Sequence, residues 1–446
     1  MLKRVQVKNY RCLKYVDVEL DNFNVLVGPN ASGKSTLLDA IQFCSDFVKD
    51  GLEKAIAKRA TSLQDLFFNR EGDSFEILIE YEFPKIEFTH YIKDRYTSDK
   101  NAFLKLYERK NTPLSTDDEA KSKLSNADYN IIRYEISIKY NNKLNKNTIN
   151  FERLLIAKPE WIKNNRHCEP PKINFSESGN VLVLFKKNDD RNFVSFSSNI
   201  GRNLSSHPKL TSDAFSTEMF LKSEFNVDEI FESVHFLFLK QLLVSDIKSL
   251  NLIGNVLKTS SQSGQGLSIL PDGSNLPWVI DNLKTKHKKK FDEWLEHLQT
   301  SLPDLTDITV HENPETLSKF LQIHYNNVAV NSWLVSDGTM RLLALTLLAY
   351  IPDFRGILMI EEPENGIHPQ ALETIFQSLS SVYNAQVMLA THSPIIVGSA
   401  KSEQILCFSK DEDGGTKVVR GSDHPALKEW KGHIDVSTLF ASGVLG

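Results

Sequence analysis

The segment GPNASGKS, residues 28–35, has glycines, a lysine and a serine at the spacing GxxxxGK[ST], which is typical of a phosphate-binding loop. The backbone amides of such a loop turn inward around an anion, and glycine lets the chain approach a phosphate with no Cβ in the way. We expect Lys34 to reach the β- and γ-phosphates of a nucleotide and Ser35 to offer its hydroxyl to Mg²⁺. The loop residues expected to bind the nucleotide are Asn30, Ala31, Ser32, Gly33, Lys34, Ser35 and Thr36.

A second chemical feature is the pair of carboxylates that follows the apolar stretch ILMI, at Glu361 and Glu362. In open α/β sheets, ligands bind at the carboxyl ends of the strands. Because adjacent strand residues point to opposite faces, the two carboxylates cannot do the same job. One can hold Mg²⁺, directly or through water, and the other can orient or deprotonate an attacking water.

Two further segments have side chains suited to phosphate chemistry. His392, in QVMLATHSP, is expected at the end of the next strand, where its imidazole can hydrogen-bond a γ-phosphate or the water; a structural histidine is the alternative. Ser336 or Asp337 can cap the helix that follows, and Gly338 can open its start to an anion; an ordinary helix N-terminus is the alternative. Because one nucleotide needs one phosphate loop, this second helix start indicates contact with the nucleotide of another subunit.

The elements that must position these residues are strands and helices in alternation. Residues 23–27, FNVLV, predict a buried strand before the phosphate loop, and residues 37–49 predict a helix after it. Alternating valines at 5, 7, 16 and 18 predict an N-terminal hairpin, and further strands are predicted at 75–83, 131–140 and 181–185. From about residue 320, strand and helix alternate again, which indicates an α/β domain with parallel strands.

The α/β character lies at both ends of the chain, with a different middle, so we expect one α/β domain interrupted by an insertion. Residues 1–204 are predicted to be its N-terminal half with a β subdomain, and 320–446 its C-terminal half. Residues 205–319 are predicted to be a mainly helical insertion, with helices over 227–250 and from Phe291 to Leu298.

Composition excludes several classes of protein. The 446 residues are 41% hydrophobic and 24% charged, with a net charge of −5, which argues against whole-surface attraction to nucleic acid. The four cysteines include no CxxC pair, so neither a zinc site nor a disulfide framework is indicated. The N-terminus lacks the apolar core of a signal peptide, and no apolar run approaches the length of a membrane span. We therefore expect a soluble cytoplasmic protein with no membrane partner.

Taken together and in order, the motifs resemble those of the ABC-type ATPase heads of the SMC, RecF and OLD group. GPNASGKST resembles the Walker A loop, VSDGTMR the signature motif, and ILMIEE a Walker B strand with the catalytic glutamate. NGIHP falls at the D-loop and His392 at the switch histidine, while VKNYRCL is similar to the opening strand of RecF-like heads. The resemblance covers roughly residues 1–85 and 320–446.

The resemblance implies an α/β fold: an ABC-type P-loop head with a mixed or parallel sheet, an antiparallel N-terminal β subdomain and the insertion. It implies ATP and Mg²⁺ as cofactors, with Ser35 and Glu361 at the metal and Arg11 near the nucleotide. Glu362 and His392 are then catalytic. Two heads of the family enclose two ATP molecules, so a homodimer or higher oligomer is implied, in which the signature residues Ser336, Asp337 and Gly338 contact the partner's ATP.

The sequence departs from the family pattern in three ways. Glu361 stands where Asp is usual, so its contact with Mg²⁺ is expected through water. The Q-loop glutamine is not placed, with Gln64 only a candidate, and the long coiled-coil arms are absent. The nearest similarity is to compact ATPases of anti-phage operons, such as the PARIS, Septu and retron-type subunits, without a Toprim nuclease. We therefore expect an ATPase that acts as sensor or scaffold for a separate effector protein, a nuclease or a toxin.

Two other functions remain open from the sequence. A RecF-like DNA-repair ATPase that clamps DNA is suggested by the basic run KTKHKKK at 284–290, which a solvated helix start explains more simply. A transporter ATPase subunit is disfavoured by the VSDGT signature, the insertion and the missing membrane domain.

Overall fold

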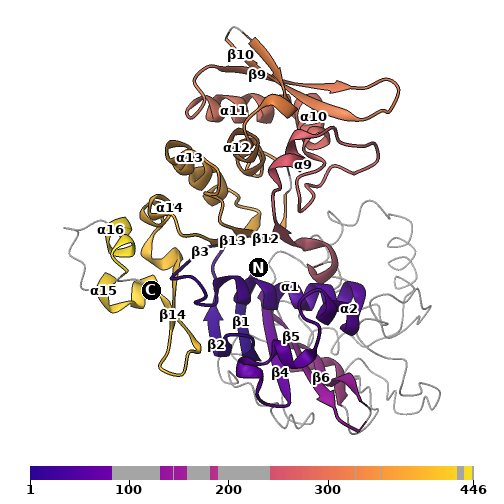
Figure 1. The fold of residues 1–446 in the computed structure, drawn as a ribbon, viewed down its shortest axis with the longest axis vertical. Coiled ribbons are helices and arrows are strands. Elements are labelled where there is room, and N and C mark those ends of the chain that lie inside the picture. The colour runs from indigo at the N-terminus through magenta and orange to yellow at the C-terminus, as the bar shows by residue number, and fades with distance from the viewer. Residues whose placement is uncertain are drawn as a thin grey trace, which may run out of the picture. The chain divides into compact units, whose positions relative to one another are not determined.

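The computed structural model describes residues 1–82, 131–143, 145–157, 181–188, 242–326, 328–352, 354–428 and 436–443. The chain forms two compact units, drawn in Figure 1. Unit 1 comprises Met1–Glu19 and Phe43–Ser245, and unit 2 comprises Leu20–Gln42 and Asp246–Gly446. No helix within the described ranges is long and apolar enough to cross a bilayer.

Unit 1 contains a six-stranded antiparallel sheet with the strand order β2-β1-β4-β5-β6-β7. The predicted N-terminal hairpin and antiparallel β subdomain are confirmed by this sheet. Its strands are β1 (Leu2–Tyr10), β2 (Leu13–Glu19), β4 (Ser74–Glu82), β5 (Ile131–Asn141), β6 (Lys146–Ala157) and β7 (Val181–Asn188). The short helix α2 (Leu52–Ala57) belongs to the same unit.

An aromatic cluster packs against this sheet from the second half of α1 (Lys34–Asp50). The ring of Phe75 meets the rings of Tyr10 and Phe43 edge-on, with centroids 5.1 Å and 5.2 Å away. All three side chains are fully buried. Burial on this scale stabilises each aromatic position by about 1.5–3 kcal/mol, so this cluster anchors the second half of α1 in unit 1.

Buried charges are paired across the strands of the same sheet. Arg4 binds Asp17 through Nε and Nη2, each at 2.7 Å, and lies 3.4 Å from Glu80. Arg133 contacts Glu80 at 3.3 Å and Glu135 at 2.5 Å. Burial raises the pKa of Glu80, and the neighbouring arginines oppose that rise. Because most of these charges are buried and are paired between neighbouring strands, the network favours this strand register.

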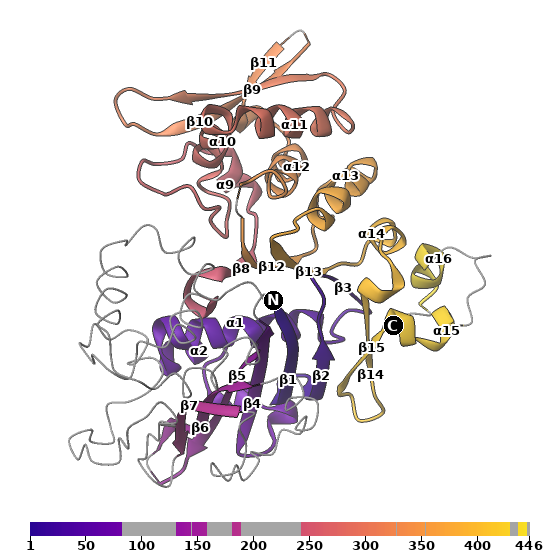
Figure 2. The ribbon, with the colours of Figure 1, turned by 180° about the vertical axis from the view of Figure 1, so that it is seen from behind.

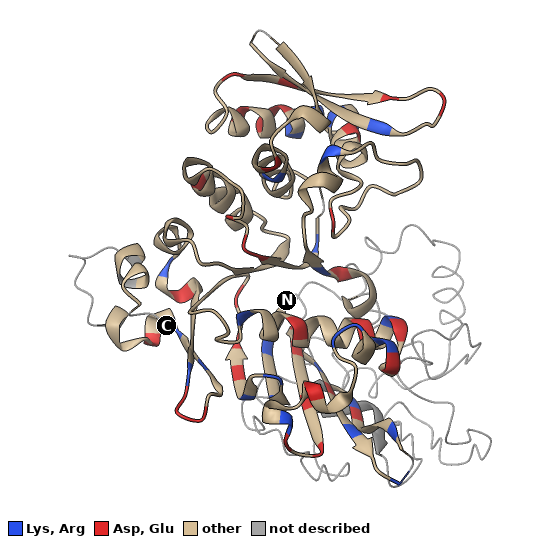
Figure 3. Ribbon diagram, viewed as in Figure 1, with Lys and Arg blue, Asp and Glu red and all other residues tan. Residues whose placement is uncertain are grey.

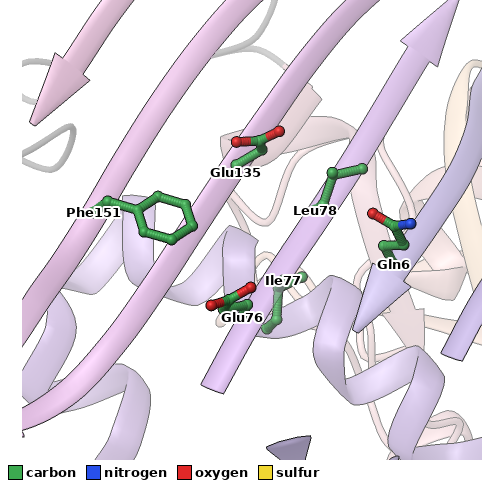
Figure 4. A pocket seen from close by; sticks show the side chains of 6 residues that line it. All are labelled: Gln6, Glu76, Ile77, Leu78, Glu135 and Phe151. Carbon is green, nitrogen blue, oxygen red and sulfur yellow. The ribbon is translucent and has the colours of Figure 1, made fainter. Parts of the chain in front are cut away.

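A small hollow lies on the sheet of unit 1, as Figure 4 shows. Its volume is about 10 Å³, which is room for about one water molecule. It is far too small for a nucleotide. The lining side chains are Gln6, Glu76, Ile77, Leu78, Glu135 and Phe151.

Unit 2 is built on a second six-stranded sheet, with the order β15-β14-β3-β13-β12-β8. All neighbours run parallel except β14 and β15. Every residue of β3 (Phe23–Val27) and β13 (Ala385–Ala390) is buried, as expected of strands covered on both faces. The remaining strands are β8 (Ile247–Leu250), β12 (Gly356–Glu361), β14 (Ile405–Lys410) and β15 (Thr416–Arg420). The predicted parallel α/β sheet is confirmed.

Helices and a smaller sheet complete unit 2, as Figures 1 and 2 show. Phe23 of β3 meets Phe376 of α13 edge-on at 5.4 Å, and Trp294 of α11 donates a hydrogen bond to Thr346 of α12 at 2.9 Å. The helices are α9 (Gly254–Lys258), α10 (Leu276–Lys286), α11 (Lys288–Gln299), α12 (Asp337–Leu347), α13 (Pro369–Ser380), α14 (Pro394–Ser399), α15 (Pro425–Lys428) and α16 (Val436–Ala441). An antiparallel sheet of order β11-β10-β9 packs on α10 and α11.

Two elements differ from the sequence prediction. Residues 247–250, predicted to end a long helix, form the edge strand β8, because they pair with the parallel strand β12. From about residue 320 the strands were predicted to be parallel. The first of them, β10 (Lys319–Tyr325), instead pairs antiparallel with β9 (Leu305–Glu312) and β11 (Val328–Asn331), outside the parallel sheet.

The expected insertion over 205–319 is described only in part. Its start at 205 and most of the helix predicted over 227–250 lie outside the described residues. Its described part contains β8, α9, α10, α11 and β9. Its expected end at residue 319 is the first residue of β10, which pairs with β9, so this hairpin spans the expected boundary.

Candidate phosphate-binding site

The predicted phosphate loop lies between β3 and α1. Gly28 has a φ of 148° and Gly33 a φ of 108°, both in the region that favours glycine. A Cβ on Gly28 would lie 2.2 Å from the carbonyl oxygen of Phe408. Ala31 also has a positive φ, of 60°, which is strained for a residue with a side chain. The loop is therefore held in a conformation that ordinary turns do not need.

Lys34 is 6% exposed and folds back over this loop. Its Nζ donates hydrogen bonds to the carbonyl oxygens of Gly28 at 2.8 Å and Pro29 at 2.9 Å. Burial lowers the pKa of its ammonium, while the nearby carboxylates of Glu362 and Glu361 favour the charged form. A buried cation whose hydrogen bonds within the described residues go to neutral carbonyls is well suited to receive an anion.

The phosphate loop is also tied to β15. The hydroxyl of Thr416 donates to the carbonyl oxygen of Ser32 at 2.8 Å, and both residues are buried. The hydroxyl of Ser32 itself is buried and has no hydrogen-bond partner among the described residues. It is therefore a polar group within the loop that a ligand can satisfy.

Glu361, the last residue of β12, meets the phosphate loop directly. The hydroxyl of Ser35 donates a hydrogen bond to the Glu361 carboxylate. A hydroxyl and a carboxylate are hard oxygen donors of the kind Mg²⁺ prefers. No cluster of metal-ligating side chains large enough to enclose an ion occurs in the described ranges. The pair therefore fits an ion that takes its remaining ligands from phosphate and water.

Glu362 projects from a strained backbone. Its φ is 47°, a left-handed value that is uncommon outside glycine and is concentrated at functional sites. Its amide donates to the carbonyl of Ala390 at 2.8 Å, and its carboxylate accepts from Nδ2 of Asn365 at 2.5 Å. The side chain is exposed, so the residue is held by its backbone while its carboxylate stays accessible.

His392 lies where the sequence places it, just past β13. Its amide donates to a carboxylate oxygen of Glu364 at 2.6 Å. Within the described part of the chain, its half-buried imidazole makes no hydrogen bond. The ring can therefore serve a phosphate or a water.

The predicted signature residues form the start of α12. The hydroxyl of Ser336 caps the helix by accepting from the amide of Thr339 at 3.1 Å. Asp337 pairs with Lys258 of α9 instead. Arg341, one turn on, donates to the carbonyl of Asn365 at 2.8 Å, which ties the helix to the D-loop segment.

Residues 23–398 match the protein family described as "AAA domain, putative AbiEii toxin, Type IV TA system". The chain belongs to this family. It is an ATPase of the ABC, SMC and OLD-like class.

Two curated proteins resemble this AAA domain in sequence. The "Retron Vc95 probable ATPase" of Vibrio cholerae is 23% identical over 408 residues, which are 89% of this chain and 71% of that protein. The "OLD nuclease" of Thermus scotoductus is 56% identical over 41 residues, which are 9% of this chain. That match covers only 8% of the nuclease.

Solved SMC head domains also align with the AAA domain. An SMC head bound to the C-terminal winged-helix domain of ScpA has 15% identity and a TM-score of 0.47, and the match covers 94% of this chain and 96% of that chain. The SMC head domain from Thermotoga maritima has 11% identity and a TM-score of 0.39. That match covers 94% of this chain and 98% of the Thermotoga chain.

Arg11 lies in unit 1, in the turn between β1 and β2, with a φ of 51°. Its amide donates to the carbonyl of Leu66 at 2.8 Å, and its guanidinium to the carbonyl of Arg59 at 3.1 Å. Its contact with a nucleotide stays a prediction. Gln64, the Q-loop candidate, is exposed in the same unit.

The sequence missed two residues that shape the site. Thr416 carries no local signal, because it meets the phosphate loop from 384 residues away. Glu364 could have been found from the sequence, because it is the third acidic residue of the segment EEPEN. Its position two residues after Glu362 and its contact with His392 make it part of the site.

Close packing gives a second reason for glycine at position 338, beside its predicted role at the anion-binding start of the helix. A Cβ there would lie 2.2 Å from the carbonyl oxygen of Gly366 in the D-loop segment. Gly338→Ala is expected to lower the free energy of unfolding by about 1–3 kcal/mol and to slow ATP hydrolysis, because the D-loop must shift. Thermal unfolding and steady-state hydrolysis measure the two effects.

Gly414→Ala is the comparison variant for Gly338→Ala. Gly414 has a φ of 80° and nothing within 4 Å of an added Cβ. This substitution costs stability through backbone strain alone, so kcat should stay at the wild-type value. Equal kcat for Gly338→Ala and the wild type would show that the contact between α12 and the D-loop is not coupled to hydrolysis.

Proposed function

We propose that the protein is an ATP-driven assembly switch: two copies join head to head around ATP and separate after hydrolysis. The observation that carries the proposal is the meeting of three strand ends at one edge of a parallel sheet. Leu26 of β3 is in register with Ala390 of β13, and Ala390 is in register with Glu361 of β12. Glu361 is itself the first of the paired carboxylates, while the phosphate loop begins two residues after Leu26 and His392 lies two residues after Ala390.

In the proposed reaction, the loop amides and Lys34 bind the phosphates. Ser35 and Glu361 would hold Mg²⁺, which neutralises charge on the β- and γ-phosphates. Glu362 accepts the proton of the attacking water, and His392 hydrogen-bonds the γ-phosphate or that water. The contact between Glu361 and Ser35 supports a direct role for Glu361 beside the metal, despite its extra methylene compared with Asp.

The proposed assembly rests on α12. Its capped N-terminus is exposed at Ser336 and Asp337 and presents backbone amides. A helix of 11 residues with such a start can bind an anion, and the family resemblance assigns that anion to the ATP of the second copy. The homodimer, or a higher oligomer, follows from this assignment.

We further propose that the switch controls a separate effector, a nuclease or a toxin, in defence against phage. The support is the retron name of one relative and the toxin–antitoxin description of the family. Purification together with the products of neighbouring genes tests this part. Full activity of the isolated protein, with no co-purifying effector, would contradict it.

A DNA clamp is less well supported. In the basic run at 284–290, Lys284 pairs with Asp307, Lys288 with Asp292 and Lys290 with Glu293, at 2.8–2.9 Å. Among the described residues, Figure 3 shows blue Lys and Arg positions interspersed with red Asp and Glu positions along the ribbon of each unit. The run is therefore largely neutralised, and we expect little salt-dependent DNA binding through it.

Light scattering tests the assembly. The monomer mass is 50.7 kDa, and we expect a doubled mass, or a larger multiple, with ATP and Mg²⁺ but not with ADP. ATP hydrolysis with no change of mass at any nucleotide would contradict head-to-head assembly while leaving the ATPase assignment intact.

A further inference from the structure

The three carboxylates of EEPEN have three different partners. Glu361 contacts Ser35 of the phosphate loop, and Glu362 contacts Asn365 of its own turn. Glu364 alone turns toward the end of β13. The first two have roles in the proposed reaction, and the third has none so far.

Glu364 fixes the start of the His392 loop. Its Oε1 accepts a hydrogen bond from the Thr391 hydroxyl at 2.9 Å and another from the His392 amide at 2.6 Å. These donors are 27 and 28 residues away in the sequence. Bonds to a charged acceptor are about twice as strong as neutral ones, so this one oxygen ties the loop after β12 to the loop after β13.

The same network continues to the phosphate loop. The Thr391 hydroxyl accepts from the amide of Ser393 at 3.0 Å. The Thr391 amide donates to the carbonyl of Leu26 at 3.1 Å, two residues before Gly28. Glu364 therefore sits in a chain of hydrogen bonds that joins all three strand ends of the site.

The second carboxylate oxygen of Glu364 takes no part in this hydrogen-bond network. Oε2 is buried and accepts no hydrogen bond from the described residues. A buried acceptor left unsatisfied costs about 1–3 kcal/mol. A glutamine would supply the Oε1 contacts without carrying a charge, so a purely structural clamp does not require a glutamate here.

We propose that Glu364 is a positioning residue for hydrolysis. Oε1 sets the backbone from which the His392 side chain extends, and Oε2 accepts a hydrogen bond from a water of the phosphate site. The inference rests on the proposed function, because it needs His392 to act on the γ-phosphate or on the attacking water.

Variants of Glu364 separate these two roles. Glu364→Ala is expected to lower kcat about 100-fold, since misplacing a catalytic group by about 1 Å has that effect. Glu364→Gln keeps one oxygen that can accept from the His392 loop but loses the second acceptor, so we expect kcat to fall about tenfold. The Kd for ATP should change by less than about threefold in both. Glu373→Gln, an exposed glutamate of α13, is the matched control and should behave as wild type.

A double-mutant cycle tests whether Glu364 acts through His392. The kcat of Glu364→Ala with His392→Ala should lie within about threefold of His392→Ala alone, because coupled residues are not additive. If the kcat loss of the double variant equalled the product of the two single losses, the inference would be wrong. A wild-type kcat for Glu364→Ala would also overturn it. A wild-type kcat for Glu364→Gln would overturn the role of Oε2.

The wild type, measured in the same series, distinguishes the failure of this inference from that of the proposed function. If the wild type does not hydrolyse ATP, the proposed function fails and the inference falls with it. If the wild type hydrolyses ATP and the Glu364 variants are unaffected, only the inference is wrong.

Discussion

Lys34→Ala is expected to raise the Kd for ATP at least about 100-fold, which corresponds to about 3 kcal/mol of binding free energy. The ammonium is buried over the phosphate loop and shares its protons with two carbonyl oxygens, of Gly28 and Pro29. A phosphate is a better acceptor than a carbonyl because the bond is charge-assisted. Titration calorimetry with ATP and Mg²⁺ measures the loss.

The control for Lys34→Ala is Lys417→Ala. Lys417 is an exposed lysine of β15 in the same unit, so its removal changes the net charge equally and should leave the Kd unchanged. The substitution at Lys34 also takes the donor from two loop carbonyls, so thermal unfolding of the free protein is needed beside the titration. A Kd within threefold of wild type, in a folded Lys34→Ala protein, would show that the loop does not bind the phosphates as proposed.

The sequence predicted the elements that carry the candidate site where its signals are local. The strand FNVLV, the loop and the following helix are contiguous, and the glycines sit where positive φ values are required. The strand ILMIE ends in its carboxylates for the same local reason. These segments could be placed without knowing any partner.

Features that depend on contacts between residues far apart in the sequence were harder to predict. Strand β8 has only four residues, IKSL, and is a strand because β12 offers an unpaired edge. The Glu364 contact with His392 spans 28 residues, and the Thr416 contact spans 384. For β10 a signal existed: Leu321 and Ile323 are fully buried while the residues between and beside them are not, the alternation of a sheet with one covered face.

The start of α12 shows how a local pattern can leave two alternatives that only the structure separates. Ser336 and Asp337 were equally able to cap α12 on sequence grounds. The structure gives the cap to Ser336, because the side chain of Asp337 is engaged by Lys258 on the neighbouring α9. A capping rule considers one helix, whereas the ion pair depends on two.

Glu362→Gln is expected to bind ATP with a Kd near that of wild type and to lower kcat about 10²–10³-fold, since general base catalysis contributes on this scale. Glutamine keeps the shape of the side chain and can still accept from Nδ2 of Asn365, so the turn should not change. It cannot take a proton from water. Because separation follows hydrolysis in the proposed cycle, the assembled species should persist with ATP, as light scattering would show.

Glu361→Gln is the matched variant that separates the two carboxylates. Glu361 contacts Ser35, so its neutralisation should raise the Mg²⁺ concentration needed for half-maximal activity. Glu362→Gln should leave the Mg²⁺ dependence of ATP binding unchanged. If Glu362→Gln hydrolysed ATP at the wild-type rate while Glu361→Gln did not, the general base would be Glu361. The strained φ of 47° at Glu362 would then need another cause, because backbone strain persists only where the surrounding structure holds it.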